Sequence, residues 1–443
     1  MPLSPARKAA FKILTRIESA STPVSEYLFS KSVNKLKVLD RGLTTELIYG
    51  VLRQRKLLDW YLSSLIIRPL NKVDNEVMTA LRLGAYQILF LSRIPDRAAV
   101  HQSVELLRKV GQHIAAGGMV NAVLRKVNKV NFDRACKKLS QHLSNSLSIL
   151  YSHPEWLVNR WINRWGLLPT RDLLKHNNLV PPVHFRSNSP ELASIRIGQL
   201  LEREGINVGL HGLGKGVWQV ISGNLTESEL FKSGKVVIQD AGSQVIPSLL
   251  DLHANDCCLD FCGGIGGKAS RIAQLGRNNV KIISLDSNLS KLQLSKCRNE
   301  NQWRNIHWIV ADGTYSLPIS RQFNKILVDV VCSGSGTLRR HPEIRWRLKP
   351  SDLDRLSVLQ SKLLANASSV LKRGGLLVYA TCSLEPEENE QVVHRFLSEN
   401  PHFYLERLFN SEINSYCDQD GFIRLLPNKS SPDGFFGAVL RKV

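Results

Sequence analysis

Two cysteines, Cys332 and Cys382, have the sequence context of chemically active thiols. The β-rich run KILVDV (325–330) ends just before Cys332, and the run LLVYAT (376–381) ends directly before Cys382. A single cysteine is more often a small buried hydrophobic residue than a reactive one. Two cysteines at strand ends beside a cofactor pocket reverse that preference, because a thiolate is a nucleophile.

A glycine-rich turn precedes these cysteines in the sequence. The run CCLDF (257–261) predicts a strand, and a helix is expected to begin near Ala269. Glycines allow a tight turn and close approach to a ligand, and a helix start presents free N–H groups. Because the turn lacks the Lys-Ser/Thr ending of nucleoside triphosphate loops, it indicates a different nucleotide-like ligand. The residues of this turn are Cys262, Gly263, Gly264, Ile265, Gly266, Gly267 and Lys268.

Two aspartates follow the next two predicted strands. Asp286 ends the run KIISL, where its carboxylate can accept both hydroxyls of a ribose. Asp312 follows the run IHWIV and is placed to contact an adenine amino group. Together with the glycine-rich turn, these residues suit S-adenosylmethionine, although they alone leave a dinucleotide oxidoreductase open.

Paired thiols beside a methyl donor suit methylation of C5 of cytosine. This carbon is a poor nucleophile, so a thiolate must first add to C6 and make an enamine whose C5 attacks the methyl sulfonium. A free cysteine has a pKa of about 8.5, so local positive charge or a helix N-terminus must stabilise the thiolate. A base must then remove the C5 proton so that the thiol can be eliminated.

The hydrophobic patterns predict three domains. Residues 1–145 carry apolar side chains at helical spacing, including Ala10, Phe11, Leu14 and Ile17 in a first helix. Residues 146–235 predict a small mixed connector, in which Trp156, Trp161 and Trp165 are expected to be core. From 236 onward, β-rich runs, of which the first is KVVIQ, alternate with helical ones and GFFGAVLRKV is a last strand. This alternation predicts a Rossmann-like, mostly parallel sheet with helices on both faces and ligands at the carboxyl ends of its strands.

Composition indicates a polyanionic partner. The formal charge is +21, from 59 basic and 38 acidic residues, and Lys or Arg placed on phosphates releases condensed counterions. The absence of a long apolar run, of CxxC spacing and of a secretory signal predicts a soluble cytoplasmic protein with reduced thiols and no metal. A monomer is expected, because a single large basic surface suffices for binding RNA. Candidate RNA-contacting residues in the helical region are Arg53, Arg55, Arg125, Lys126 and Lys129. The basic segment Arg339–Arg340 with Arg345–Trp346–Arg347 is a further candidate. The alternative is that Glu343 and nearby acids pair with the arginines of this segment.

The sequence resembles known families in two regions. Residues 81–111 and 117–127 resemble the helical RNA-binding domain of the antitermination factor NusB. The motifs DFCGGIGGK (260–268), VDVVCSGSGTLRRHPEIRW (328–346) and YATCSLEPEENE (379–390) resemble the RNA cytosine-5 methyltransferases. In this combination, the chain resembles the bacterial small-subunit ribosomal RNA methyltransferase family RsmB, also called Sun or Fmu.

The resemblance implies a role for each motif residue. Cys382 would be the nucleophile, Cys332 would assist release of the product, and Asp329 would bind the polar edge of cytosine with help from Lys268. Residues Cys262–Lys268, Asp286, Asp312 and Asp329 would hold S-adenosylmethionine. The expected substrate is 16S ribosomal RNA.

Two departures from the family pattern keep other functions open. Ile265 stands where the family usually has proline, and Val330–Val331 replace an alanine-proline pair. The second change could move a backbone carbonyl that helps to read the cytosine amino group. The alternatives are a transfer RNA cytosine-5 methyltransferase, and a ribosome-assembly RNA-binding protein with weak or lost catalysis.

Overall fold

The chain divides into two compact units. The computed structural model describes residues 2–17, 22–140, 142–189, 192, 194–214, 216–299, 302–317, 319, 322–407, 414–427 and 432–443. The helical unit comprises Met1–Leu179 with Leu338–Arg347, and the second unit comprises Val180–Thr337 with Leu348–Val443. Residues of the predicted connector, 146–235, therefore contribute helices to the first unit and a small sheet to the second.

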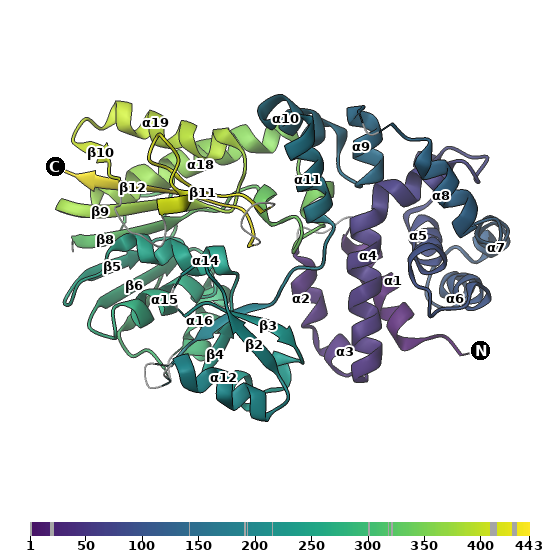
Figure 1. Ribbon diagram of the computed structural model, residues 1–443, viewed down its shortest axis with the longest axis horizontal. Helices are drawn as coiled ribbons and strands as arrows, with labels where there is room; N and C mark the ends of the chain where they lie inside the picture. The colour runs from purple at the N-terminus through teal and green to yellow at the C-terminus, as the bar shows by residue number, and fades with distance from the viewer. Residues whose placement is uncertain are drawn as a thin grey trace. The chain divides into compact units, whose positions relative to one another are not determined.

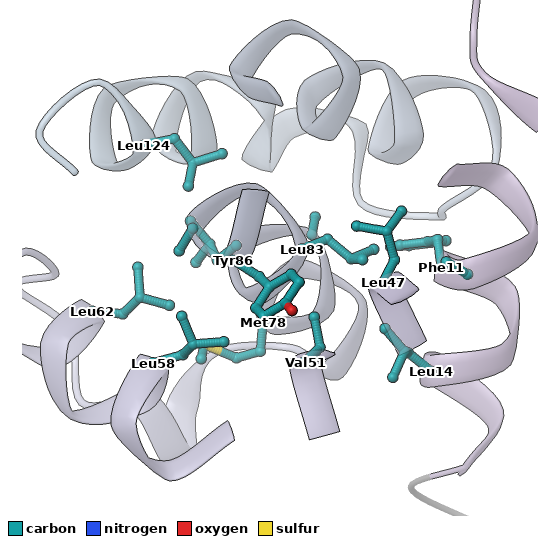
Figure 2. Close-up of a cluster of buried hydrophobic side chains, with 14 of the residues drawn as sticks. Phe11, Leu14, Leu47, Val51, Leu58, Leu62, Met78, Leu83, Tyr86 and Leu124 are labelled. Atoms are coloured by element: carbon teal, nitrogen blue, oxygen red, sulfur yellow. The ribbon is translucent and has the colours of Figure 1, made fainter. Parts of the chain in front are cut away.

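The helical unit packs around one apolar core. Ala10, Phe11, Leu14 and Ile17 are buried, as the spacing in the first helix predicts. Figure 2 shows Phe11 and Leu14 of α1 near side chains from α4, and further core residues from α5 and α7. The helices are α1 (Pro5–Ile17), α2 (Val24–Leu28), α3 (Lys31–Asn34), α4 (Val38–Ser63), α5 (Asn75–Phe90), α6 (Asp96–Lys109), α7 (Gly117–Leu124), α8 (Lys129–Lys137), α9 (Ser144–Leu150), α10 (Glu155–Trp165), α11 (Leu167–Asn177) and α17 (Ile344–Arg347).

Trp161 of α10 is fully buried, and its ring lies 6.2 Å from that of Trp165. The prediction that Trp161 is core is confirmed.

None of the helices in the described ranges combines the length and apolar character that crossing a membrane requires.

The second unit begins with a small antiparallel sheet of order β2-β3-β1-β4. Its core includes Phe185 and Trp218, whose rings stack with centroids 6.1 Å apart. The run KVVIQ forms the edge strand of this sheet, where it pairs with β1. The prediction that this run belongs to the parallel sheet is therefore wrong, because the alternation of strands and helices does not determine which strands pair. The elements are β1 (His184–Ser187), α12 (Ser194–Arg203), β2 (Asn207–Leu210), β3 (Trp218–Ser222), α13 (Glu229–Lys232) and β4 (Val236–Ile238).

The large sheet has the predicted Rossmann-like, mostly parallel architecture. Its strand order is β10-β12-β9-β8-β5-β6-β7, with β11 paired to β12. Strands β5 to β9 are parallel, β12 pairs antiparallel with β9, and β10 forms the edge beyond β12. The elements are α14 (Ala241–Val245), β5 (Cys257–Asp260), α15 (Gly267–Leu275), β6 (Lys281–Asp286), α16 (Leu289–Asn299), β7 (Ile306–Val310), β8 (Phe323–Asp329), α18 (Pro350–Ser369), β9 (Leu371–Thr381), α19 (Glu390–Glu399), β10 (Phe403–Leu405), β11 (Ile423–Leu425) and β12 (Phe435–Lys442).

Strand β9 contributes to two apolar cores, one on each face of the sheet. Leu376, Val378 and Ala380 belong to a cluster that includes residues of α14 and α15, whereas Leu377 and Tyr379 belong to one with residues of α18 and α19. This alternation follows from the two-residue period of a strand. The helices consequently cover both faces, as Figure 1 shows in teal for α14 and α15 and in green for α18 and α19.

The basic segment 338–347 belongs to the helical unit. Arg345 is fully buried and donates to Ser152 O and Asn178 Oδ1 at 2.9 Å and to backbone oxygens of Asn177 and Leu338. The predicted contact of Arg345 with an RNA backbone is therefore wrong, because protein oxygens occupy its guanidinium. The acceptors of Arg345 are carbonyl oxygens, rather than the acidic partners of the alternative prediction.

The predicted basic surface of the helices is only partly correct. Arg53 is buried, donates to Arg339 O at 3.2 Å and lies over the ring of Tyr49, so its placement on the surface is wrong. Arg125, Lys126 and Lys129 are exposed as predicted.

Replacement of Arg345 by methionine should destabilise the helical unit strongly. We expect the free energy of unfolding to fall by about 3 kcal/mol, because buried carbonyl oxygens would lose their donor. Urea titration followed by circular dichroism measures this change. The exposed Arg355 provides a control, since Arg355→Met should change stability by less than about 0.5 kcal/mol. Unchanged stability of Arg345→Met with weakened RNA binding would instead restore the phosphate-binding role.

Candidate active site

The parallel pairing of β8 and β9 brings the two cysteines together. Asp329 at the end of β8 is in register with Ala380 near the end of β9, so the chain leaves both strands at the same edge. Beyond that edge, the Sγ atoms of Cys332 and Cys382 lie 3.2 Å apart, and both residues are half-buried. The sulfurs are thus in direct contact at the carboxyl edge of the sheet.

Backbone packing holds the two cysteine loops against each other. The N–H of Gly336 donates to Cys382 O at 3.0 Å. A Cβ on Gly336 would lie 2.8 Å from Cys382 O and 2.5 Å from Gly434 O, so only glycine allows this approach. Gly336 therefore allows the two cysteine loops to pack together.

An ion pair lies beside the cysteines. Lys268 Nζ lies 2.5 Å from Asp329 Oδ2, and both side chains are largely buried. Burial disfavours the charged form of Lys268, but negative charge on Asp329, and then on Cys382 and Asp260, outweighs it and raises the lysine pKa. Lys268 is consequently a permanent cation near the Cys382 sulfur, as expected for a group that stabilises a thiolate.

The glycine-rich turn is anchored to β6. Gly263 N–H donates to Leu285 O at 2.8 Å, and Gly264 N–H donates to Asp286 Oδ2 at 2.9 Å. A Cβ at Gly263 would lie 2.0 Å from Ser284 Oγ, so glycine is required at this position. After the turn, α15 begins at Gly267 and presents Lys268 in its first turn.

Carboxylates surround this turn and give the site a negative balance. Asp260 is fully buried, and its Oδ1 atom has no hydrogen-bond partner among the described residues. Burial raises the pKa of Asp260 to about 7, against the opposing charge of Lys268. Asp312 is exposed, and hydrogen bonds from Thr314 lower its pKa. Even without Asp260, the carboxylates of Asp286 and Asp329 outnumber the single charge of Lys268, which fits a ligand carrying positive charge.

Sequence reasoning missed Arg186, which supports the glycine-rich turn. Its fully buried guanidinium donates to Gly267 O at 2.9 Å, Ser270 Oγ at 2.7 Å and Gln239 Oε1 at 2.6 Å. Burial, and then the charge of Arg271, lowers the pKa of Arg186. Arg186 thus fixes the start of α15 from the small sheet. The only available signal was a lone charge in the β-rich run VHFRS.

The departures from the family pattern have different surroundings. Ile265 is 49% exposed in the turn. Val330 is buried and its N–H donates to Ala380 O at 3.1 Å, whereas Val331 is exposed. The carbonyl of Val331 accepts from Gln360 Nε2 at 3.0 Å. That hydrogen bond fixes the backbone just before Cys332.

Three family models match parts of the chain. The model of 16S rRNA methyltransferase RsmB/F matches residues 247–441, the NusB family model matches 4–129, and the RsmF/B-like ferredoxin-like domain matches 153–217. The chain is 33% identical to the probable ribosomal RNA small subunit methyltransferase B of Bacillus subtilis over 98% of both chains. It is 31% identical to the ribosomal RNA small subunit methyltransferase B of Yersinia enterocolitica, over 99% of this chain and 97% of that one.

Solved structures share the fold. The structure titled PH0851 has a TM-score of 0.84 and 24% identity, and the match covers 100% of this chain and 99% of that one. A methyltransferase homolog protein from Pyrococcus horikoshii has a TM-score of 0.59 and 27% identity, over 68% of this chain and 99% of that one. The family model and the sequence relatives define an RNA methyltransferase. The chain belongs to the ribosomal RNA small subunit methyltransferase B family, which confirms the predicted resemblance, including the NusB-like helical domain.

The buried Asp260 should make stability depend on pH. Its folded-state pKa is raised to about 7 from about 3.9 in an unfolded chain, so the folded protein holds the proton more tightly. The second unit should therefore lose stability between about pH 4 and pH 7, by on the order of 2–4 kcal/mol. In Asp260→Asn this fall should largely disappear, as measured by urea titration at several pH values. The exposed Asp354→Asn should retain the fall, and an unchanged profile in Asp260→Asn would contradict the assignment.

Proposed function

We propose that this chain transfers a methyl group from S-adenosylmethionine to C5 of a cytosine in 16S ribosomal RNA. The observation that carries the proposal is the contact of the Cys332 and Cys382 sulfurs at 3.2 Å, beside the Lys268–Asp329 ion pair. The relatives' names support small-subunit ribosomal RNA as the substrate.

The cofactor site comprises the glycine-rich turn and the aspartates at neighbouring strand ends. Asp286 is oriented by the N–H groups of Gly264 and Asn288, and its oxygens retain lone pairs for ribose hydroxyls. Asp312 is exposed and available to an adenine amino group. When bound, S-adenosylmethionine supplies an electrophilic methyl group. The residues assigned to it are Cys262, Gly263, Gly264, Ile265, Gly266, Gly267, Lys268, Asp286, Asp312 and Asp329.

Cys382 adds to the substrate. Its thiolate bonds to C6 of cytosine, the electron pair of the C5–C6 double bond shifts to C4–C5, and the pair of the C4–N3 double bond moves to N3, which gives an enamine. The ammonium of Lys268 stabilises negative charge on the sulfur before attack. Asp329, oriented by Lys268, accepts a hydrogen bond from the polar edge of the base. C5 is then nucleophilic enough to take a methyl group.

Cys332 assists breakdown of the methylated adduct. A base takes the C5 proton, the electron pair of that C–H bond re-forms the C5–C6 double bond, and the C6–sulfur bond breaks so that Cys382 departs as thiolate. The contact between the two sulfurs leaves Cys332 close to the adduct.

The RNA must present an unpaired or flipped cytosine. Extrusion from a helix costs a few kcal/mol, whereas a single-stranded loop avoids most of that cost. The net charge of +21 and the exposed Arg125, Lys126 and Lys129 favour binding to the phosphate backbone. We further infer a cytoplasmic protein that acts as a monomer.

Cofactor binding should stabilise the folded protein. At a concentration about a hundred times its Kd, S-adenosylmethionine should add about 2.7 kcal/mol to stability and raise the melting temperature. Thermal melting measures the shift, with adenosine triphosphate as the control nucleotide. No shift at millimolar S-adenosylmethionine would count against the cofactor site.

The two cysteine variants should fail at different steps. Cys382→Ala should abolish both methyl transfer and the covalent RNA adduct, because C6 has no nucleophile. Cys332→Ala should form the adduct but release it slowly, so a complex should survive denaturing electrophoresis. Labelled methyl transfer to unmodified small-subunit RNA, with transfer RNA in parallel and bisulfite sequencing, measures the product. Label only in transfer RNA would change the substrate, and cofactor binding without label on either RNA would favour an assembly factor.

A further inference from the structure

Glu388 is a buried carboxylate next to the cysteine pair. It ends a short 3₁₀ turn, Pro386–Glu388, that follows β9, and it is fully buried. No ion pair found among the described residues involves Glu388. A buried charge without a counter-ion is costly and requires hydrogen bonds to keep it.

The hydrogen bonds of Glu388 connect the two cysteine loops. Oε1 accepts from Ser333 N–H at 2.7 Å, and Oε2 accepts from Ser383 Oγ at 2.5 Å. Ser333 directly follows Cys332, and Ser383 directly follows Cys382. One carboxylate therefore binds the residue after each reactive sulfur.

A second layer of contacts fixes the carboxylate itself. Gln360 Nε2 donates at 3.0 Å both to Glu388 Oε1 and to Val331 O, so it supports the loop on the other side of Cys332. Tyr379 Oη donates to Glu388 O at 2.6 Å, and Asn389 Nδ2 donates to Ser383 O at 2.9 Å. The position of Glu388 is thus set by β9 and α18, independently of any substrate.

We propose that Glu388 is a positioning residue that holds the two cysteine loops in contact. Its negative charge keeps Cys332 protonated, while Cys382 bears the thiolate beside Lys268. The inference deepens the proposed function, on which it rests for the different roles of the two sulfurs. It explains how two chemically identical groups in contact are distinguished: Cys382 lies on the side of the Lys268 cation, and Cys332 adjoins the Glu388 anion.

The electrostatics of the pair agree with this arrangement. The pKa of Cys332 is raised, first by its hydrogen bond with Cys382, then by burial, and then by the charges of Cys382 and Glu388. Burial raises the pKa of Glu388, and hydrogen bonds from Ser333, Ser383 and Gln360 oppose that rise. Among the described residues, Lys268 lies near Cys382 and Tyr379 lies near Cys332. The titratable groups next to these two are Asp260, Asp329 and Cys262.

Alkylation of Cys332 tests the charge directly, without RNA or cofactor. The reduced full-length Cys382→Ala protein is treated with iodoacetamide across pH 6–10, and labelling of the Cys332 peptide is quantified by mass spectrometry. The added substitution Glu388→Gln keeps the side-chain shape but removes the charge, so Cys332 should ionise at lower pH. Its alkylation at pH 7.5 should be about fivefold faster, which corresponds to a downward shift of about 0.7 pH units in the midpoint of the profile. Glu399→Gln, an exposed change on α19, should leave the rate unchanged.

Glu388→Asp separates charge from geometry. In the Cys382→Ala background it retains the anion, so Cys332 should stay slow to alkylate. In the otherwise native protein the shorter side chain should lower kcat for methylation at least tenfold with a smaller effect on KM. A merely structural role predicts similar alkylation profiles for Glu388→Gln and Glu388→Asp.

Three results would overturn the inference. One is an unchanged Cys332 profile in a folded Glu388→Gln protein. Another is a Cys332 alkylation profile in the Cys382→Ala parent whose pH midpoint is at or below about 8.5, the value for a free cysteine. This midpoint can be measured even if Glu388→Gln does not fold. The third is full methylation by Glu388→Asp. By contrast, methylation that persists in Cys382→Ala alone would refute the proposed nucleophile, while a shifted alkylation profile would still support the role of Glu388.

Discussion

The parallel hydrogen-bond ladder between β8 and β9 is the constraint on which the site depends. It pairs Val328 with Tyr379 and Asp329 with Ala380, so the two chains leave the sheet side by side. Apolar cores on both faces bury these strands and fix the register, because a shift by one residue would exchange the two faces of β9. Cys332 and Cys382, which are far apart in sequence, meet because the strands that precede them cannot slip.

The same edge of the sheet concentrates carboxylates, and the fold has to accommodate their charge. Lys268 neutralises Asp329, Gly264 N–H binds Asp286, and hydrogen bonds retain Glu388. Asp260 has the least compensation, and burial raises its pKa to about 7. Such imperfect compensation is typical of sites that await a charged ligand. Arg186 stabilises the turn among these groups by binding its backbone rather than by neutralising a carboxylate.

The segment 338–347 shows that a cluster of arginines is not by itself a nucleic-acid surface. It lies in the sequence between β8 and α18, yet its contacts belong to the helical unit. Arg345, which is fully buried, and Arg347, which is partly buried, donate to backbone oxygens there. Exposed cations such as Arg125 and Lys126 remain the better candidates for phosphate contacts.

The sequence by itself determined the kind of fold, the strand ends that carry functional groups, and the two cysteines. These features depend on local periodicity and on motifs such as GGIGGK and TCS, whose residues are close together in the chain. The tertiary structure alone decided which of the polar residues are buried and which groups they bind. Arg345 and Arg53 have structural roles because they donate to carbonyl oxygens that are distant in sequence. The run KVVIQ is an edge strand because it pairs with β1 of the small sheet. Arg186 could not be recognised because its contact with Gly267 spans 81 residues of sequence and leaves no periodic pattern. Glu388 lies within the motif YATCSLEPEENE, but its link to the Cys332 loop spans 55 residues and is visible only in the folded chain.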